Sequence, residues 1–186
     1  MIIQLCGLSG AGKTTIARSV QQKASTCGIP IEIIDGDAYR ESLCRDLTFS
    51  KEDRCENIRR LGFVASRLSS YGITCIISAI NPYDAVRREL AMKYAQVKTV
   101  YIDCTLDELI ARDTKGLYKR ALLPEHHPDK LNNLTGVNDP FEAPAHPDLH
   151  LRTDRNSVQT CTNTLFQFIQ QAVKKQETRY SHAASI

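Results

Sequence analysis

The sequence has no long apolar run, no closely spaced pair of cysteines and no strong excess of charge of either sign. A membrane-spanning helix needs about 20 consecutive apolar residues, and no stretch approaches that length. The formal net charge is only +3 over 186 residues, whereas a protein that binds nucleic acid usually carries a basic stripe. We therefore expect neither a membrane nor a nucleic-acid partner.

Disulfides and a cysteine metal site are not indicated either. The seven cysteines are scattered and odd in number, and neither they nor the histidines have metal-site spacing. Such thiols are typical of a reducing compartment. The amino end has no basic region before its apolar residues and no small-residue cleavage site, so we expect a cytoplasmic protein.

Short β-branched runs alternate with helical patterns, an order that is typical of a parallel sheet. The strands are predicted at residues 2–6, 31–34, 74–77, 97–102 and 149–151. Helices are predicted at 14–27, 50–71 and 157–175, with a short one at 105–112 and further helical stretches past Ala38 and after Asn81. We expect one α/β domain over residues 1–175, with about five parallel strands between two helical layers, and a polar tail at 176–186. Ligands should gather at the carboxyl ends of the strands.

Two capping boxes mark predicted helix starts, Ser50 with Asp53 and Thr105 with Glu108. Between residues 113 and 147, five of the seven prolines and two adjacent histidines leave little room for regular structure. A long irregular loop in a compact domain is usually a lid or a binding loop. We predict a lid over about residues 113–147.

The stretch GLSGAGKTT, residues 7–15, has the spacing of a P-loop and stands between a predicted strand and a predicted helix. Its glycines let backbone amides point at a phosphate, and the helix start adds positive dipole. Lys13 is expected to reach the β and γ phosphates of ATP, and the hydroxyl of Thr14 to bind Mg²⁺. The rest of the predicted cradle is Gly7, Ser9, Gly10, Ala11, Gly12 and Thr15.

A P-loop alone does not separate switches, motors and kinases. In many P-loop proteins an Asp ends the strand beside the P-loop strand, but here the run at 74–77 is followed by Ser78. Asp35 and Asp37 follow the second strand instead, with a glycine between them that allows close approach to phosphates. We predict that one carboxylate, with Asp35 as the candidate, holds Mg²⁺, while the other orients or deprotonates an attacking hydroxyl.

An acceptor site is indicated by Arg54 and Asn57, which share a face of the predicted helix, and by Arg40 before it. Guanidinium groups suit planar oxyanions, so an acidic nucleotide is favoured. The alternative for these residues is an ordinary solvated helix face. Arg59 and Arg60 are assigned to such a face or to local ion pairs.

Five stretches resemble, in order and through nearly the whole chain, the motifs of the adenosine 5'-phosphosulfate (APS) kinase family: GLSGAGKTT, DGDAYR, DRCENIRR, RDTKGLYKRA and LTGVNDPFEAP. The resemblance implies a P-loop kinase that transfers the γ-phosphoryl group of ATP to the ribose 3'-hydroxyl of APS with Mg²⁺, in sulfate assimilation. It implies that Arg40, Arg54 and Asn57 hold the phosphosulfate. It also implies that Phe49 and Phe141 enclose the APS adenine, that Arg112 lies by the ATP adenine, and that the acceptor site includes Ile80, Asn81 and Lys115.

The chain departs from the family at three places. Asn81 stands where some members carry a phosphorylatable serine, so direct in-line transfer is predicted. Thr114 replaces a usual proline, and the lid is longer than the family's, with His126 and His127 assigned to exposed loop. Because a lid excludes water from the γ-phosphate, these changes bear on rate and acceptor selectivity more than on reaction class.

Two other functions stay open at this point. The chain could phosphorylate a different nucleotide, as in surface polysaccharide modification, or be a non-catalytic P-loop module. The sequence has no Asn-Lys-x-Asp guanine signature, which argues against a P-loop switch. Because family members often dimerise, a homodimer is a further expectation of the resemblance.

Overall fold

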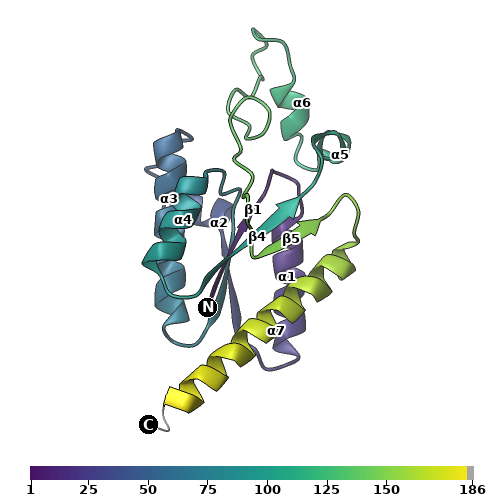
Figure 1. Cartoon of the computed structure of the whole chain (residues 1–186). Coiled ribbons are helices and arrows are strands. Elements are labelled where there is room, and N and C mark those ends of the chain that lie inside the picture. Colours follow the sequence, from purple (N-terminus) through teal and green to yellow (C-terminus); the bar gives the residue numbers. More distant parts are fainter. Residues whose placement is uncertain (184–186) are drawn as a thin grey trace.

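The computed structural model describes the backbone of residues 1–183 and the side chains of residues 1–174, and its centre is a five-stranded sheet (Figure 1). The strand order is β2-β3-β1-β4-β5, and every pairing is parallel. The strands are β1 (Ile2–Cys6), β2 (Ile31–Asp35), β3 (Thr74–Ser78), β4 (Val97–Asp103) and β5 (Leu149–Arg152). The predicted α/β class and strand number are confirmed.

Helices cover both faces of the sheet (Figure 1). On one face, α1 (Lys13–Ser25) and α7 (Val158–Ala183) pack over a core that includes Ile3 and Leu5. On the other, α3 (Lys51–Ser69) and α4 (Asp84–Lys93) pack over Ile2 and Ile77. Because successive strand side chains point to opposite faces, β1 is buried on both sides.

Three short helices lie near the carboxyl ends of the strands: α2 (Gly36–Arg40), α5 (Leu106–Arg112) and α6 (Leu117–Ala121). The last one interrupts the segment predicted to be irregular, residues 113–147. In Figure 1 this segment projects beyond the carboxyl end of the sheet, at the top of the view. It is in position to act as the predicted lid.

The predicted helix caps are confirmed in part. The Ser50 hydroxyl accepts a hydrogen bond from the Asp53 amide at 3.1 Å, but the Asp53 carboxylate turns to the Thr48 amide, at 2.8 Å, instead of the helix start. Thr105 precedes α5 without any side-chain cap bond, so the second capping box is wrong although the helix is there.

The end of the last helix differs from the prediction. The backbone of α7 stays helical through Ala183, well beyond the predicted boundary at residue 175, so most of the expected polar tail is helix. Residues 184–186 lie outside the described part. Within residues 1–183, no helix is long and apolar enough to cross a membrane.

All seven cysteines are free thiols. Five of them are buried, among them Cys6, Cys75 and Cys104 beside or within strands. Burial raises the pKa of the Cys6 and Cys75 thiols to about 11. These side chains are therefore protonated and serve as small apolar core residues.

Candidate active site

The loop between β1 and α1 has the backbone of a phosphate cradle. Gly10 and Gly12 have φ angles of +75° and +97°, which residues other than glycine rarely adopt. A Cβ on Gly7 would lie 2.1 Å from the Ile102 carbonyl oxygen. No side chain caps the start of α1, so its first amides are left to bind an anion.

Lys13 lies at the first position of α1, and only 9% of it is exposed. Its ammonium group donates to the carbonyl oxygens of Gly7, at 2.9 Å, and Leu8, at 2.7 Å. Burial, aided by the charge of Lys115, lowers the pKa of Lys13 to about 8. A phosphate group beside it would stabilise the charged form.

The last residues of two strands, Asp35 of β2 and Ser78 of β3, meet at the Thr14 hydroxyl of α1. It donates to the Asp35 carboxylate at 2.9 Å, and its oxygen lies 2.9 Å from the Ser78 hydroxyl. The other Asp35 oxygen accepts from the amides of Asp37 and Ala38, which caps α2 and fixes the carboxylate. The second strand's acid and the P-loop therefore face each other.

These oxygens suit Mg²⁺. Magnesium is usually held by one or two carboxylates together with substrate phosphates and water, and Thr14 and Asp35 provide a hydroxyl and a carboxylate beside the phosphate cradle. No cluster of three histidine, cysteine or acidic side chains suited to a metal occurs in the described part of the chain. The donor set thus fits a nucleotide-bound Mg²⁺ better than a resident metal such as zinc.

Asp37 connects α2 to the lid. Its carboxylate forms a 2.8 Å ion pair with the Lys115 ammonium, and 82% of its side chain is exposed. A cavity of about 220 Å³ lies between the P-loop, the two acids and the base of the lid. Its wall includes these predicted site residues: Ser9, Gly10, Gly12, Lys13, Thr14, Thr15, Asp35, Asp37, Ile80 and Lys115. Gly7 and Ala11 are buried.

The predicted acceptor arginines meet at Phe49. The guanidinium carbons of Arg40 and Arg54 lie 4.5 and 5.4 Å from the centre of its ring, which is cation–π geometry. Arg54 also donates to the Phe49 carbonyl at 2.9 Å and to the Asn133 carbonyl of the lid at 2.7 Å. Burial and the nearby Arg54 charge lower the pKa of Arg40.

Asn57 lies on the same helix face as Arg54 and is buried. Its side-chain oxygen has no hydrogen-bond partner among the described residues. Because buried polar atoms are nearly always paired, this oxygen is open to a donor from a ligand. Its predicted contact with the acceptor stays a prediction.

The two predicted adenine-binding rings lie apart. Phe49 lies against the arginines, whereas Phe141 stacks on Tyr101 of β4 with ring centres 6.0 Å apart. Tyr101 stacks in turn on His150, at 4.9 Å. In this conformation the two rings contact different neighbours and not each other. The binding of an adenine between Phe49 and Phe141 therefore stays a prediction.

Asn81 points into the protein rather than into the cavity. It is 1% exposed, and its side-chain amide donates to the Gln4 side chain at 3.2 Å. Its carbonyl accepts from the buried Arg87 at 2.7 Å. The side-chain oxygen of Asn81 has no hydrogen-bond partner among the described residues, and its predicted contact with the acceptor stays a prediction.

Arg112 ends α5, directly before the segment predicted to be the lid, and its predicted place by the ATP adenine stays a prediction. It donates to the Glu108 carboxylate at 2.8 Å and to the Thr153 carbonyl at 3.0 Å. Two residues that the sequence did not indicate contact the P-loop itself. The Tyr118 hydroxyl donates to the Ser9 carbonyl at 2.8 Å, and the Thr153 hydroxyl to the Ala11 carbonyl at 3.0 Å.

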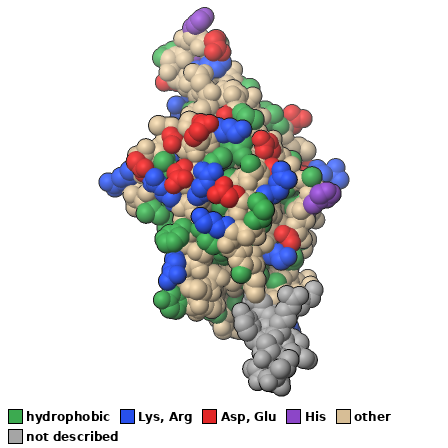
Figure 2. All heavy atoms as spheres, turned by 60° about the vertical axis from the view of Figure 1, so that its left-hand side comes forward, with side chains coloured by type: hydrophobic (Ala, Val, Ile, Leu, Met, Phe, Trp, Pro, Cys, Tyr) green, Lys and Arg blue, Asp and Glu red, His purple; other side chains and the backbone are tan. Residues whose placement is uncertain are grey.

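The predicted local ion pairs of Arg59 and Arg60 are confirmed. Both reach Glu56, at 3.6 and 3.2 Å, and each has a second acidic partner. Figure 2 shows basic and acidic side chains interspersed on the side of the molecule that carries α3 and α4. These two arginines are thus part of a mixed surface and not of the acceptor site.

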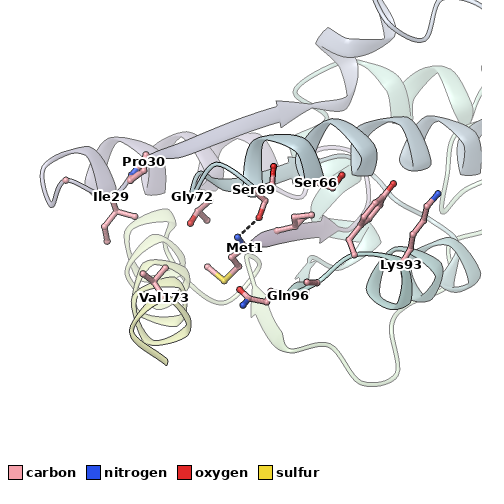
Figure 3. Close-up of a pocket in the computed structure, with 15 residues that line it drawn as sticks. Met1, Ile29, Pro30, Ser66, Ser69, Gly72, Lys93, Gln96 and Val173 are labelled. Carbon is pink, nitrogen blue, oxygen red and sulfur yellow. Dashed lines mark hydrogen bonds between the residues drawn. The ribbon is translucent and has the colours of Figure 1, made fainter. Parts of the chain in front are cut away.

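A larger cavity, of about 670 Å³, lies at the opposite end of the sheet (Figure 3). It is lined by residues at the amino ends of strands and the carboxyl ends of helices, including Met1, Ser69, Lys93 and Gln96. The Met1 amino group donates to the Ser69 hydroxyl at 2.6 Å. None of the predicted site residues lines it, so size alone does not identify the active site.

The P-loop after the central strand and the two acids that face it define a P-loop kinase. The sequence model described as adenylylsulphate kinase matches residues 1–152, and the chain belongs to this family of ATP-dependent kinases.

Curated relatives and a solved structure support the same family membership. The adenylyl-sulfate kinase of Chloroflexus aurantiacus is 45% identical over 165 residues, 89% of this chain and 86% of the relative. That of Deinococcus deserti is 46% identical over 158 residues, 85% of this chain and 84% of the relative. The structure of the Mycobacterium tuberculosis APS kinase CysC in complex with AMPPNP and APS superposes with a TM-score of 0.80 at 34% identity, covering 88% and 94% of the two chains.

Proposed function

We propose that this protein transfers the γ-phosphoryl group of ATP to the ribose 3'-hydroxyl of APS, which gives 3'-phosphoadenosine 5'-phosphosulfate for sulfate assimilation. One observation carries the proposal: Asp35 and Asp37 face the P-loop across a cavity lined by both. The names of the similar adenylyl-sulfate kinases support the choice of acceptor. The altered residue at 81 and the longer lid leave the reaction class unchanged.

On the ATP side, the P-loop amides and Lys13 bind the phosphates, with Arg112 near the adenine. Thr14 and Asp35 would hold Mg²⁺, which neutralises charge on the β and γ phosphates when it is bound. Lys13 stabilises the charge on the moving phosphoryl group, since an ammonium in a buried site acts more strongly than in water. These residues position the phosphates and neutralise their charge, which is most of what phosphoryl transfer requires of a protein.

On the acceptor side, Asp37 orients the 3'-hydroxyl and accepts its proton, and Lys115 holds the Asp37 carboxylate. Asn81 has no hydroxyl to phosphorylate, so the phosphoryl group passes directly from ATP to the acceptor. Arg40, Arg54 and Asn57 bind the phosphosulfate. Phe49 and Phe141 enclose the adenine after giving up their present packing against the arginines and Tyr101.

A cytoplasmic location and a homodimer belong to the same proposal. The location is supported by the seven free thiols, which persist in a reducing compartment. The homodimer rests on the family resemblance alone.

The test is a steady-state assay of ADP release with ATP, Mg²⁺ and a panel of acceptors: APS, other adenosine nucleotides and cytidine nucleotides. The proposal predicts turnover with APS that exceeds every other acceptor. A faster rate with another nucleotide would establish an enzyme with a different acceptor. Nucleotide binding without turnover on any acceptor would establish a non-catalytic module.

A further inference from the structure

Side chains donate hydrogen bonds to four carbonyl groups of the P-loop. Lys13 binds the carbonyls of Gly7 and Leu8, which uses a residue of the motif itself. The carbonyls of Ser9 and Ala11 are bound instead by Tyr118 and Thr153, from segments more than a hundred residues away in the sequence. The loop is therefore not held by its own motif alone.

These two carbonyls matter because of the planar trans peptide. In such a unit the carbonyl of one residue and the amide of the next point in opposite directions. A hydrogen bond to the Ser9 carbonyl thus orients the Gly10 amide, and one to the Ala11 carbonyl orients the Gly12 amide. Both glycines have positive φ angles, and glycine backbones rotate more freely than others. The peptide units that can rotate most easily, 9–10 and 11–12, are therefore the ones whose carbonyls accept from Tyr118 and Thr153.

Tyr118 is a firmly held donor. It lies in α6 at the base of the lid and is 2% exposed. Burial raises the pKa of its hydroxyl to about 12, so the phenol keeps its proton. The helix around it is fixed by Asp113, whose carboxylate accepts from the amides of Tyr118 and Lys119 at 3.1 and 2.9 Å.

Thr153 is held just as firmly, directly after β5. Its amide donates to the Asp103 carbonyl at 2.8 Å, and its carbonyl accepts from Arg112. Its hydroxyl lies 3.0 Å from the Ala11 carbonyl and 3.2 Å from that of Asp103. The P-loop is therefore tied both to the lid base and to the end of the outer strand.

We propose that Tyr118 and Thr153 are positioning residues, which fix the peptide units 9–10 and 11–12 so that their amides face the nucleotide phosphates. This inference rests on the proposed function only in that the loop binds a nucleotide. Without one of these hydroxyls, the buried carbonyl of Ser9 or Ala11 loses its hydrogen-bond donor. The peptide unit can then turn its carbonyl oxygen toward the nucleotide, where it repels the phosphate oxygens. Loss of a buried partner of this kind corresponds to a weakening of about tenfold.

The experiment compares Tyr118→Phe and Thr153→Val with the parent protein. ADP affinity is measured by calorimetry, which needs no acceptor, and kcat and the two KM values are measured with ATP and APS. Thr153→Ser keeps the hydroxyl and is the rescue variant. Thr162→Val is the matched control, since Thr162 is buried and its hydroxyl has no partner among the described residues. Tyr94→Phe, beside the distant cavity, controls for loss of a phenol hydroxyl.

We expect the ADP dissociation constant and the KM for ATP to rise about tenfold in Tyr118→Phe and Thr153→Val, with the KM for APS unchanged. Thr153→Ser and both controls should stay within about twofold of the parent protein. A merely destabilised variant would lose active enzyme, which lowers kcat and moves neither KM. The inference is overturned if ADP affinity is unchanged in both folded variants, or if Thr162→Val weakens it equally. Failure of the proposed function would appear separately, as a parent protein that binds ADP but does not turn over APS.

Discussion

The Thr14 hydroxyl donates to the Asp35 carboxylate at 2.9 Å, across the end of the strand that lies between β2 and the P-loop strand β1. That strand, β3, ends in Ser78, whose hydroxyl lies 2.9 Å from the same Thr14 oxygen. A small residue at this point leaves room for the acid of β2 to reach the P-loop. The carboxylate that many P-loop proteins place on the adjacent strand is here supplied from one strand further away.

This relationship predicts how the metal requirement changes when Thr14 is altered. Thr14→Val removes the hydroxyl at nearly constant volume, and we expect the Mg²⁺ concentration for half-maximal rate to rise about tenfold. Thr14→Ser keeps the oxygen and should stay near the parent value. Titration of initial rate against Mg²⁺ after treatment with EDTA measures both. An unchanged Mg²⁺ dependence in Thr14→Val would contradict the assignment.

Lys13→Ala removes the buried ammonium at the phosphate cradle. We expect kcat to fall by a factor on the order of a thousand, because the lost charge is aimed at the group that moves. Initial rates at saturating ATP and APS measure the effect. Lys98→Ala is a suitable control, since it removes an exposed ammonium paired with Asp148 and should leave kcat unchanged.

Asp37→Asn keeps the shape of the side chain but removes the proton acceptor. We expect kcat to fall by about a hundredfold or more, with ADP affinity nearly unchanged because the P-loop is intact. The exposed ion pair with Lys115 contributes little to stability, so the variant should unfold at nearly the parent temperature. A kcat within a few-fold of the parent value would remove Asp37 from the mechanism.

Arg54→Ala tests the acceptor site. The KM for APS should rise by at least about tenfold, since a charged hydrogen-bonding group is lost, while the KM for ATP stays nearly constant. Arg59→Ala, on the same helix but paired with Glu56 and Glu89 at the surface, should alter neither value. Equal losses in both KM values for Arg54→Ala would count against its assignment. Because Arg54 also ties Phe49 to the lid, the folded state of the variant should be confirmed by circular dichroism.

The sequence predicted the sheet, the P-loop and the meeting of that loop with the two acids, because each depends on local patterns. Strand periodicity and glycine spacing are read from neighbouring residues, and parallel topology brings strand ends together without further information. The Glu56 pairs of Arg59 and Arg60 follow in the same way from helical spacing.

The features that the sequence did not predict depend on contacts between distant segments. Tyr118 and Thr153 reach the P-loop only after the lid base and β5 have folded beside it, and neither type of residue signals such a role. The burial of Asn81 depends on Gln4 and Arg87, which come from two other elements. The stacking of Phe141 on Tyr101 likewise joins the lid to β4.

The proposed reaction requires a second nucleoside whose 3'-hydroxyl lies between the P-loop and the acids, and a comparison of two acceptors tests this requirement. Initial rates of ADP formation are measured with APS and with its 3'-deoxy analogue, at equal concentrations and with ATP and Mg²⁺ saturating. The account predicts rapid ADP formation and a 3'-phosphorylated product with APS, and no ADP formation above background with the analogue. Equal rates with the two compounds, or phosphorylation of APS at another position, would contradict it.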